Sequence, residues 1–189
     1  MLHGTGADEN DLIPLGRALA PDAALLSLRG KVTENGMPRF FRRLAMGVFD
    51  LEDLALRTEE LGDFVEAAAE AYGFDTTRIV LVGYSNGANI GGSLLLQRPG
   101  LVRAAVLLHA MVPFVPEVLP DLTGTSVLVT GGRRDPMIPG DQTQELARML
   151  SDAGAAVDLE MRPGGHALDE AEMQRAASWV AALDLDGPG

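Results

Sequence analysis

The stretch Ile79-Val-Leu-Val-Gly-Tyr-Ser-Asn-Gly-Ala88 carries the strongest structural signal in this chain. Its first four residues are apolar and predict a buried strand, and the run from Ala88 to Gln97 has the pattern of a helix. Between them lies Gly83-Tyr-Ser-Asn-Gly87, a Gly-x-Ser-x-Gly elbow whose tight turn exposes the serine hydroxyl and needs glycine on both sides. The sequence therefore predicts a nucleophilic serine, Ser85, between a strand and a helix.

Short apolar runs alternate with helical patterns along the rest of the chain. Strands are expected at Ala24–Leu28, Ile79–Val82, Ala104–Leu108, Val127–Thr130 and Val157–Met161, and helices at Asn10–Ala20, Asp53–Tyr72, Ala88–Gln97, Gln142–Ala153 and Leu168–Leu183. Strands that alternate with helices form a mainly parallel sheet covered on both faces, so this order predicts an α/β fold of three layers. At 189 residues the chain fits one domain, residues 1–189.

The composition excludes several classes of site and partner. The formal net charge of −12 disfavours binding to nucleic acid or to anionic lipid. The chain has no cysteine, which excludes disulfides, thiolate metal sites and a cysteine nucleophile. No group of His, Asp and Glu has the sequence spacing of metal ligands, and no phosphate-binding loop occurs. We therefore expect no metal, no cofactor and no nucleic-acid partner.

The chain also lacks the sequence signals of export and membrane insertion. Residues Met1 to Asp11 are acidic and have no apolar segment of the kind found in signal peptides. The longest apolar stretch, residues 101–118, is interrupted by charged residues and prolines. We expect a cytoplasmic protein with no membrane partner, acting on a small molecule, and the sequence leaves a homodimer open.

A serine hydroxyl needs a base to become a nucleophile, and the chain offers three histidines. His166 lies in the glycine-rich loop 163–167 between the last expected strand and the last helix, where an imidazole can reach the end of a strand. His109 ends a strand and His3 lies in a loop. We expect His166 to be the base for Ser85, and the alternative is a structural histidine.

The imidazole needs a carboxylate that fixes its tautomer and stabilises its cation. Asp135 follows the expected strand Val127–Thr130, and open α/β sheets bind ligands at the carboxyl ends of their strands. The alternative is that Asp135 only forms a turn before a proline, and Asp141 is a weaker candidate because it resembles a helix N-cap. The chain order of serine, aspartate and histidine is that of α/β-hydrolases.

Acyl transfer also requires hydrogen-bond donors for the oxyanion. The first expected donor is the backbone N–H of Asn86, the residue after the nucleophile. The second is the backbone N–H of Thr5 in the glycine-containing loop His3–Asp8, where His3 shapes the loop. The alternative for this loop is an ordinary glycine-rich turn in which Asp8 caps the next helix.

A basic segment, residues 29–43, interrupts an otherwise acidic chain. It follows an expected strand whose carboxyl end faces the site, so we expect Arg39 or Arg29 to attract an anionic group of the substrate, beside an apolar wall from Phe40 or Phe41. The alternative is that these cations pair with surface acids, where each exposed pair contributes about 0–1 kcal/mol. The expected substrate-binding residues are Arg29, Arg39, Phe40, Met111 and Ile138.

Taken together, these motifs resemble the phospholipase/carboxylesterase branch of the α/β-hydrolase superfamily, which includes acyl-protein thioesterases. The resemblance is carried by Leu2-His-Gly-Thr-Gly-Ala-Asp-Glu-Asn10, Gly83-Tyr-Ser-Asn-Gly-Ala88, residues 132–139 and Gly165-His166, and residues 29–42 resemble a bacterial subgroup linked to hydroquinone or aromatic-ring catabolism. It implies a three-layer fold without a lid domain, and a serine hydrolase that cleaves carboxylic esters with small or short acyl groups through Ser85, His166 and Asp135. Alternatives are a thioesterase or lysophospholipase-type hydrolase, or a hydrolase-fold binding protein of low activity.

The chain departs from this family at its start. Family members have strands before the His-Gly loop, whereas only Met1 and Leu2 precede His3 here. The missing strand is central in the family sheet, between those expected at Ala24–Leu28 and Ile79–Val82. Unpaired backbone groups there would be costly, so we expect that the chain starts late, that the gap closes or that a second copy fills it.

Overall fold

The computed structural model describes residues 1–185 and has an α/β architecture, as expected. Its centre is a sheet of four parallel strands in the order β5-β6-β7-β8, with β5 at Val80–Tyr84, β6 at Ala104–Leu108, β7 at Ser126–Gly132 and β8 at Ala156–Arg162. All five residues of β6 are buried, as are six of the seven in β7. These strands are covered on both faces, which explains their unbroken apolar sequence.

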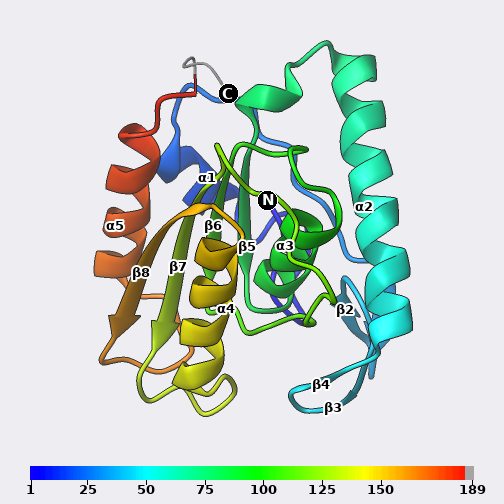
Figure 1. Cartoon of the computed structure of the whole chain (residues 1–189), viewed down its shortest axis with the longest axis vertical. Helices are drawn as coiled ribbons and strands as arrows, with labels where there is room; N and C mark the ends of the chain where they lie inside the picture. The colour runs from blue at the N-terminus through cyan, green and yellow to red at the C-terminus, as the bar shows by residue number, and fades with distance from the viewer. Residues whose placement is uncertain (186–189) are drawn as a thin grey trace.

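The helices form the two outer layers (Figure 1). One face of the sheet packs against α3 (Asn86–Gln97) and α4 (Gly140–Asp152), and the long helix α2 (Leu51–Tyr72) packs against α3. The other face packs against α1 (Ile13–Leu19) and α5 (Glu170–Ala181), which contact each other. The short 3-10 helix η1 (Thr76–Arg78) leads into β5. Each face therefore has its own apolar core.

The first helix is shorter than the sequence pattern predicts. It was expected from Asn10 but begins at Ile13, with a proline in its first turn. The side chain of Asp8 accepts a hydrogen bond from the backbone N–H of Asn10 at 2.8 Å, and this turn competes with helical geometry. The other four helices begin and end within two residues of their expected bounds.

The gap expected in the sheet is closed by the first two residues. Leu2 forms parallel bridges to Leu28 on one side and to Gly83 on the other. Its backbone N–H donates to Val82 O at 2.8 Å, and its carbonyl accepts from the N–H of Tyr84 at 3.0 Å. The strand expected at Ala24–Leu28 is reduced to this single bridge, so that prediction was wrong in extent. Leu2 is buried and satisfies the backbone groups of β5 that face it.

The basic segment is not a plain loop, which corrects the sequence-based interpretation. It contains the antiparallel hairpin β1 (Val32–Glu34) and β2 (Met37–Arg39), and a second hairpin, β3 (Arg43–Ala45) and β4 (Val48–Phe49), follows. Asn35 and Gly36 connect the first pair with φ angles of 51° and 80°. A two-residue Asn-Gly connection with both φ angles positive is the favoured turn for such a hairpin, so the sequence did contain the signal.

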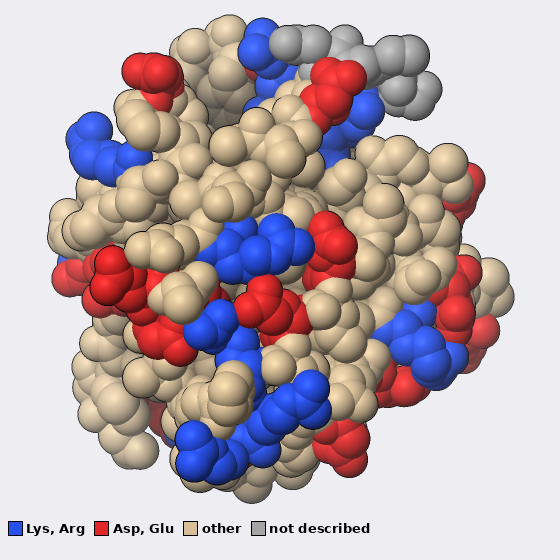
Figure 2. Space-filling view, turned by 90° about the vertical axis from the view of Figure 1, so that its left-hand side faces the viewer, with Lys and Arg blue, Asp and Glu red and all other residues tan. Residues whose placement is uncertain are grey.

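Charged side chains of both signs cover the edge of the sheet at β8 (Figure 2). Arg162 pairs with Glu160 at 2.7 Å and with Asp169 at 3.0 Å, and Arg175 pairs with Glu160 at 3.3 Å. Charged residues on an edge strand oppose pairing with another chain. Within residues 1–185, none of the helices has both the length and the apolar character needed to cross a bilayer.

Candidate active site

The elbow places Ser85 at the carboxyl end of β5, directly before α3. Ser85 has a φ of 53° and a ψ of −113°, a conformation that is strained for a residue with a side chain. A Cβ atom on Gly83 would lie 2.5 Å from Gly87 O, and one on Gly87 would lie 2.0 Å from Leu2 O. Glycine is therefore required at both positions, because the backbone of the turn contacts its own helix and the first residues of the chain.

The structure brings the three expected triad residues into one hydrogen-bonded line. His166 Nε2 lies 2.9 Å from Ser85 Oγ, and His166 Nδ1 lies 2.7 Å from Asp135 Oδ2. Asp135 Oδ1 accepts from the backbone N–H groups of Met137 at 2.8 Å and Ile138 at 3.1 Å. Because Oδ1 is held in this way, Oδ2 of Asp135 points toward the imidazole of His166. The rival carboxylate, Asp141, is the second residue of α4 and accepts from the N–H of Gln142.

Backbone contacts hold the two loops that carry the acid and the base. In the loop after β7, the backbone N–H of Arg134 donates to Gly164 O at 3.0 Å. A Cβ atom on Gly132 would lie 2.3 Å from Gly165 O, so the two loops are in close contact. The hydroxyl of Tyr84 donates to His166 O at 2.8 Å. The imidazole is thus positioned by the carboxyl ends of β5, β7 and β8, and the close approach of the two loops is possible only because they contain glycine.

Burial and hydrogen bonding act in opposite directions on Asp135. Burial works to raise its pKa, but the hydrogen bonds from His166, the N–H of Met137, His109 and the N–H of Ile138 together hold the pKa below its ordinary value. Its side chain is only 1% exposed, so the charge is shielded from water and directed at the imidazoles. In contrast, burial raises the pKa of Tyr84 to about 12, helped by the negative charges around it, so this phenol stays neutral.

Thr5 and Asn86, whose backbone N–H groups are the expected oxyanion donors, line the same pocket as Ser85. Asn86 opens α3, where no carbonyl of the same helix can accept from its backbone N–H. Thr5 Oγ1 accepts from Arg39 at 2.7 Å, and His3 bonds to Gly4 O at 2.6 Å and accepts from Gly30 N at 3.0 Å. These contacts give the loop around Thr5 a defined shape, and they agree with a structural role for His3.

The side chain of Asn86 has an unsatisfied donor. Its Oδ1 accepts from the backbone N–H of Phe40 at 2.7 Å, which ties the end of the first hairpin to the elbow. Its Nδ2 is buried, and no residue in the described part of the chain accepts from it. Asn86 lines the pocket next to Ser85, and a buried donor without a partner in such a place fits a site that receives a polar group.

A small pocket opens at Ser85. Its walls come from the Thr5 loop, the two hairpins, the start of α3 and the loops after β6 and β7, and they include Thr5, Arg39, Arg43, Phe49, Met111 and Ile138. The structure therefore brings Arg39, Met111 and Ile138 to the nucleophile as expected. Arg43 and Phe49, which were not among the expected substrate-binding residues, line it as well.

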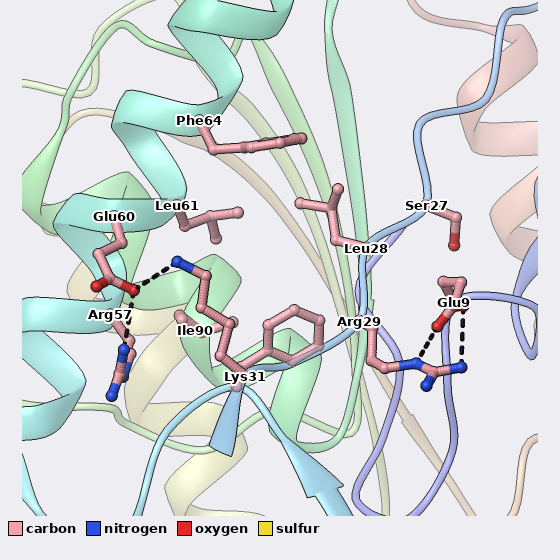
Figure 3. Close-up of a pocket in the computed structure, with 11 residues that line it drawn as sticks. Glu9, Ser27, Leu28, Arg29, Lys31, Arg57, Glu60, Leu61, Phe64 and Ile90 are labelled. Carbon is pink, nitrogen blue, oxygen red and sulfur yellow. Dashed lines mark hydrogen bonds and ion pairs between the residues drawn. The ribbon is translucent and has the colours of Figure 1, made fainter.

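Two expected substrate-binding residues lie in a different pocket. Arg29 and Phe40 line a larger cavity of about 300 Å³ between α2 and the segment 27–31, and Ser85 is not among its lining residues. Figure 3 shows this cavity with Arg29 on its wall. Arg29 bonds to both carboxylate oxygens of Glu9, and the ring of Phe40 packs on His3 at a centroid distance of 4.8 Å. Both side chains thus have structural partners, and the expectation that they contact substrate is not supported by their position.

The sequence did not indicate that His109 and Glu172 meet beneath the triad. His109 Nδ1 lies 3.0 Å from Asp135 Oδ2, the same oxygen that His166 contacts, and His109 Nε2 lies 3.3 Å from Glu172 Oε2. Thr130 Oγ1 donates to the other oxygen of Glu172. The side chains of His109 and Glu172 are each 2% exposed. The only sequence signal was the position of His109 at the end of a strand.

His109, Asp135 and His166 offer three potential ligand atoms within 4.8 Å of one another, which the sequence spacing did not indicate. Their nitrogen and oxygen atoms approach to 2.7 and 3.0 Å, which are hydrogen-bond distances. His166 Nε2 is directed at Ser85. This donor set is therefore arranged to transfer and hold protons between its members.

Comparison with known proteins supports a hydrolase of the carboxylesterase type. Residues 39–184 match the model of the dienelactone hydrolase family. The "Putative hydrolase MhqD" of Bacillus subtilis (strain 168) is 48% identical over 179 residues, which are 95% of this chain and 90% of that protein. The crystal structure of the Bacillus cereus carboxylesterase is 47% identical, with a TM-score of 0.93, and the match covers 95% of this chain and 85% of that one. The structure of YahD with malic acid is 30% identical, with a TM-score of 0.90, over 95% of this chain and 90% of that one.

Proposed function

The chain belongs to the dienelactone hydrolase family and is an esterase-type hydrolase, and we propose that it cleaves small carboxylic esters through an acyl-enzyme on Ser85. The observation that carries the proposal is the continuous line from Ser85 Oγ through His166 to Asp135, with contacts of 2.9 and 2.7 Å. Nucleophile, base and orienting carboxylate are within hydrogen-bond reach before any substrate binds.

In the first half of the reaction, His166 Nε2 takes the proton of Ser85 while the serine oxygen attacks the ester carbonyl carbon. The backbone N–H groups of Asn86 and Thr5 stabilise the oxyanion that forms. The tetrahedral intermediate then breaks its bond to the alcohol oxygen, which receives the proton from His166. The alcohol leaves, and the acyl group remains bound to Ser85.

In the second half, a water molecule takes the place of the alcohol. His166 removes one proton from the water as its oxygen attacks the acyl carbon, and the same donors hold the new oxyanion. The intermediate releases the serine oxygen, which recovers the proton from His166, and the product is a carboxylic acid. Asp135 stays ionised throughout, and its depressed pKa favours that state.

We further propose that the pocket prefers esters bearing a second, anionic group. Arg39 and Arg43 both reach Glu34, at 3.3 and 2.8 Å, so two guanidinium groups share one carboxylate. The excess positive charge lies in the wall of the pocket that contains Ser85, on a chain whose net charge is −12. The relative YahD, determined with malic acid, supports this preference because malic acid is a dicarboxylic acid.

The reaction is tested with p-nitrophenyl acetate and with a fluorophosphonate probe. Wild-type protein should release p-nitrophenol and be labelled on one serine, whereas Ser85→Ala should do neither. A thioester substrate, tested in parallel, measures the relative preference for the two bonds. Failure of wild-type protein to hydrolyse either substrate or to react with the probe would reject the proposal.

The anion preference is tested on Arg43, because Arg39 also holds Thr5 and its loss would disturb the oxyanion loop. We expect Arg43→Gln to lower kcat/KM for a p-nitrophenyl hemisuccinate by roughly five- to tenfold, the effect of losing one partly buried charge pair, and to change p-nitrophenyl butyrate hydrolysis much less. Arg42→Gln is the matched control, because Arg42 is exposed and bonds to Asp50. Equal losses for both esters would remove the idea.

A further inference from the structure

A buried group of polar side chains contacts Asp135 in addition to His166. Glu172 enters from α5 and accepts from Thr130 Oγ1 of β7 through one carboxylate oxygen. Its other oxygen faces His109 Nε2 at 3.3 Å, and His109 Nδ1 faces Asp135 at 3.0 Å. The chemistry proposed above does not use Thr130, Glu172 or His109, and a polar group buried at this depth is costly unless it is fully paired.

The backbone at His109 is also unusual. His109 follows β6 with a φ of 54°, in the left-handed region that side chains other than glycine rarely adopt. Its N–H donates to Thr130 O at 3.0 Å, and the preceding carbonyl, Leu108 O, accepts from the N–H of Ser85 at 2.9 Å. Backbone hydrogen bonds therefore fix the main chain at His109 between the elbow and the end of β7. The carboxylates of Asp135 and Glu172 hold its imidazole ring. Strain of this kind at a functional site points to a role for the side chain.

The number of protons shared by His109, Asp135 and Glu172 determines the charge of this buried group. A neutral imidazole has one N–H, yet both ring nitrogens of His109 face carboxylate oxygens. The hydroxyl proton of Thr130 is already donated to Glu172. A proton must therefore lie between His109 and Glu172, and the two ring N–H bonds of an imidazolium would satisfy both carboxylates.

We propose that Glu172, anchored by Thr130, holds His109 as an imidazolium. This ion pair positions Asp135 and weakens the interaction of the Asp135 carboxylate with His166. The inference rests on the proposed roles of Ser85, His166 and Asp135. Glu172 and His109 are positioning residues, because neither contacts the nucleophile. The ion pair shares the acceptor oxygen of Asp135 with His166, so the carboxylate is fixed from two directions while part of its charge is balanced.

The charges around the group agree with this assignment. Burial lowers the pKa of His109, but hydrogen bonds and charge interactions with Glu172 and Asp135 outweigh it, and the pKa is raised. His166 packs edge-on against His109 at a ring-centroid distance of 5.2 Å, so a positive charge on His109 lies close to the ring of His166. The other titratable group packed on both rings is Tyr84 of β5, whose raised pKa keeps it neutral. Asp11 also acts on Tyr84 through its charge, and Asp169 caps α5 by accepting from the N–H of Glu172.

The substitution Glu172→Gln tests the ion pair without changing the size of the side chain. The oxygen of the new amide would still accept from Thr130, and its nitrogen would donate to His109 Nε2, so His109 would become neutral. Loss of the nearby positive charge should move the acidic limb of kcat/KM up by about 0.5 to 1 pH unit. If Glu172 carries the proton instead, the same substitution replaces one neutral donor by another, and no shift should occur.

Nitrogen NMR of the histidine side chains reports the protonation state of His109 without requiring enzyme activity. The chain has three histidines, which can be assigned by substitution. In wild-type protein at pH 7 both nitrogens of His109 should have imidazolium shifts, and in Glu172→Gln the Nε2 shift should move to that of an unprotonated nitrogen. Neutral His109 in wild-type protein would overturn the proposal.

Two further variants separate this role from a merely structural one. Thr130→Val conserves shape, removes the hydrogen bond to Glu172 and should move the acidic limb in the same direction by a smaller amount. Glu170→Gln makes the same chemical change on an exposed position of α5 and should leave the pH profile unaltered. Unshifted profiles in both Glu172→Gln and Thr130→Val, in enzyme that the fluorophosphonate probe still labels, would reject the ion pair and keep the proposed function.

Discussion

Replacement of Asp135 by asparagine tests the proposed triad at the atom that orients the base. The amide oxygen can still accept from the N–H groups of Met137 and Ile138, so the loop keeps its shape. The amide nitrogen then takes the position of Oδ2 and donates toward His166 Nδ1, which lies 2.7 Å away in the wild-type structure. The imidazole must accept there, and its proton moves to Nε2.

This change of tautomer removes the base function. Ser85 Oγ, at 2.9 Å from Nε2, would face an N–H donor and could no longer give its proton away. Loss of the correct tautomer in a Ser-His-Asp triad costs about 10⁴-fold in kcat, which corresponds to about 5.5 kcal/mol of transition-state stabilisation. We therefore expect Asp135→Asn to retain a folded structure and to lose activity by about this factor.

The assay is kcat/KM for p-nitrophenyl acetate, with Ser85→Ala as the baseline. Asp141→Asn is the matched control, because it makes the same change at an aspartate of the first turn of α4 and should leave activity near that of the wild type. Circular dichroism and thermal unfolding establish that Asp135→Asn is folded. Activity within tenfold of the wild type, in a protein whose Ser85→Ala form is inactive, would refute the reasoning.

Three further outcomes follow from the structure. In Gly87→Ala the new Cβ would lie 2.0 Å from Leu2 O, so we expect the free energy of unfolding to fall by about 3 kcal/mol or more, or folding to fail. In the control Gly92→Ala, on the same helix, the new Cβ meets only ordinary contacts at 3.8 Å, and the free energy of unfolding should rise by about 0.5–1 kcal/mol. Urea unfolding measures both changes. The depressed pKa of Asp135 means that its contribution to stability is present above the pKa of an unfolded aspartate and is lost as pH falls through the folded value. Acid titration of the unfolding free energy should therefore show a shallower loss in Asp135→Asn than in the wild type. Arg98 pairs with three acids of α2 at 2.9–3.0 Å, so Arg98→Leu should lower the melting temperature by a few degrees in low salt and by less in 1 M NaCl.

The sequence predicted the four central strands and the proximity of Ser85, His166 and Asp135 because both depend on local patterns. Strands buried on both faces have continuous apolar sequences, and the elbow marks where one of them ends. The residues that should lie near Ser85 then follow from a rule of topology, that parallel strands end at the same edge of the sheet. The apolar pattern explains why β6 matches its expected bounds. The topology rule explains why His166 and Asp135 lie together.

The parts that were missed depend on contacts between distant residues. The hairpins were hidden by a charge pattern that favoured a loop interpretation, although the Asn-Gly pair at positions 35 and 36 is a turn signal. Glu172 follows the N-cap Asp169 by three residues, a spacing typical of an acid that caps a helix end, yet its side chain is buried against His109. The partner of Glu172 is 63 residues away, and sequence periodicity carries no information on such a pair.

Residues of the second hairpin line the pocket at Ser85, so the ester preference proposed above should be open to redesign separately from the proposed chemistry. Ser85, His166 and Asp135 are positioned by the sheet and its glycine contacts, whereas part of the pocket wall comes from residues 43–49. The anchors to keep are Arg39 and Phe40, which bond to Thr5 and Asn86. A library that varies only the second hairpin should therefore yield enzymes with new ester selectivity and an unchanged catalytic apparatus, a division of labour that directed evolution can exploit.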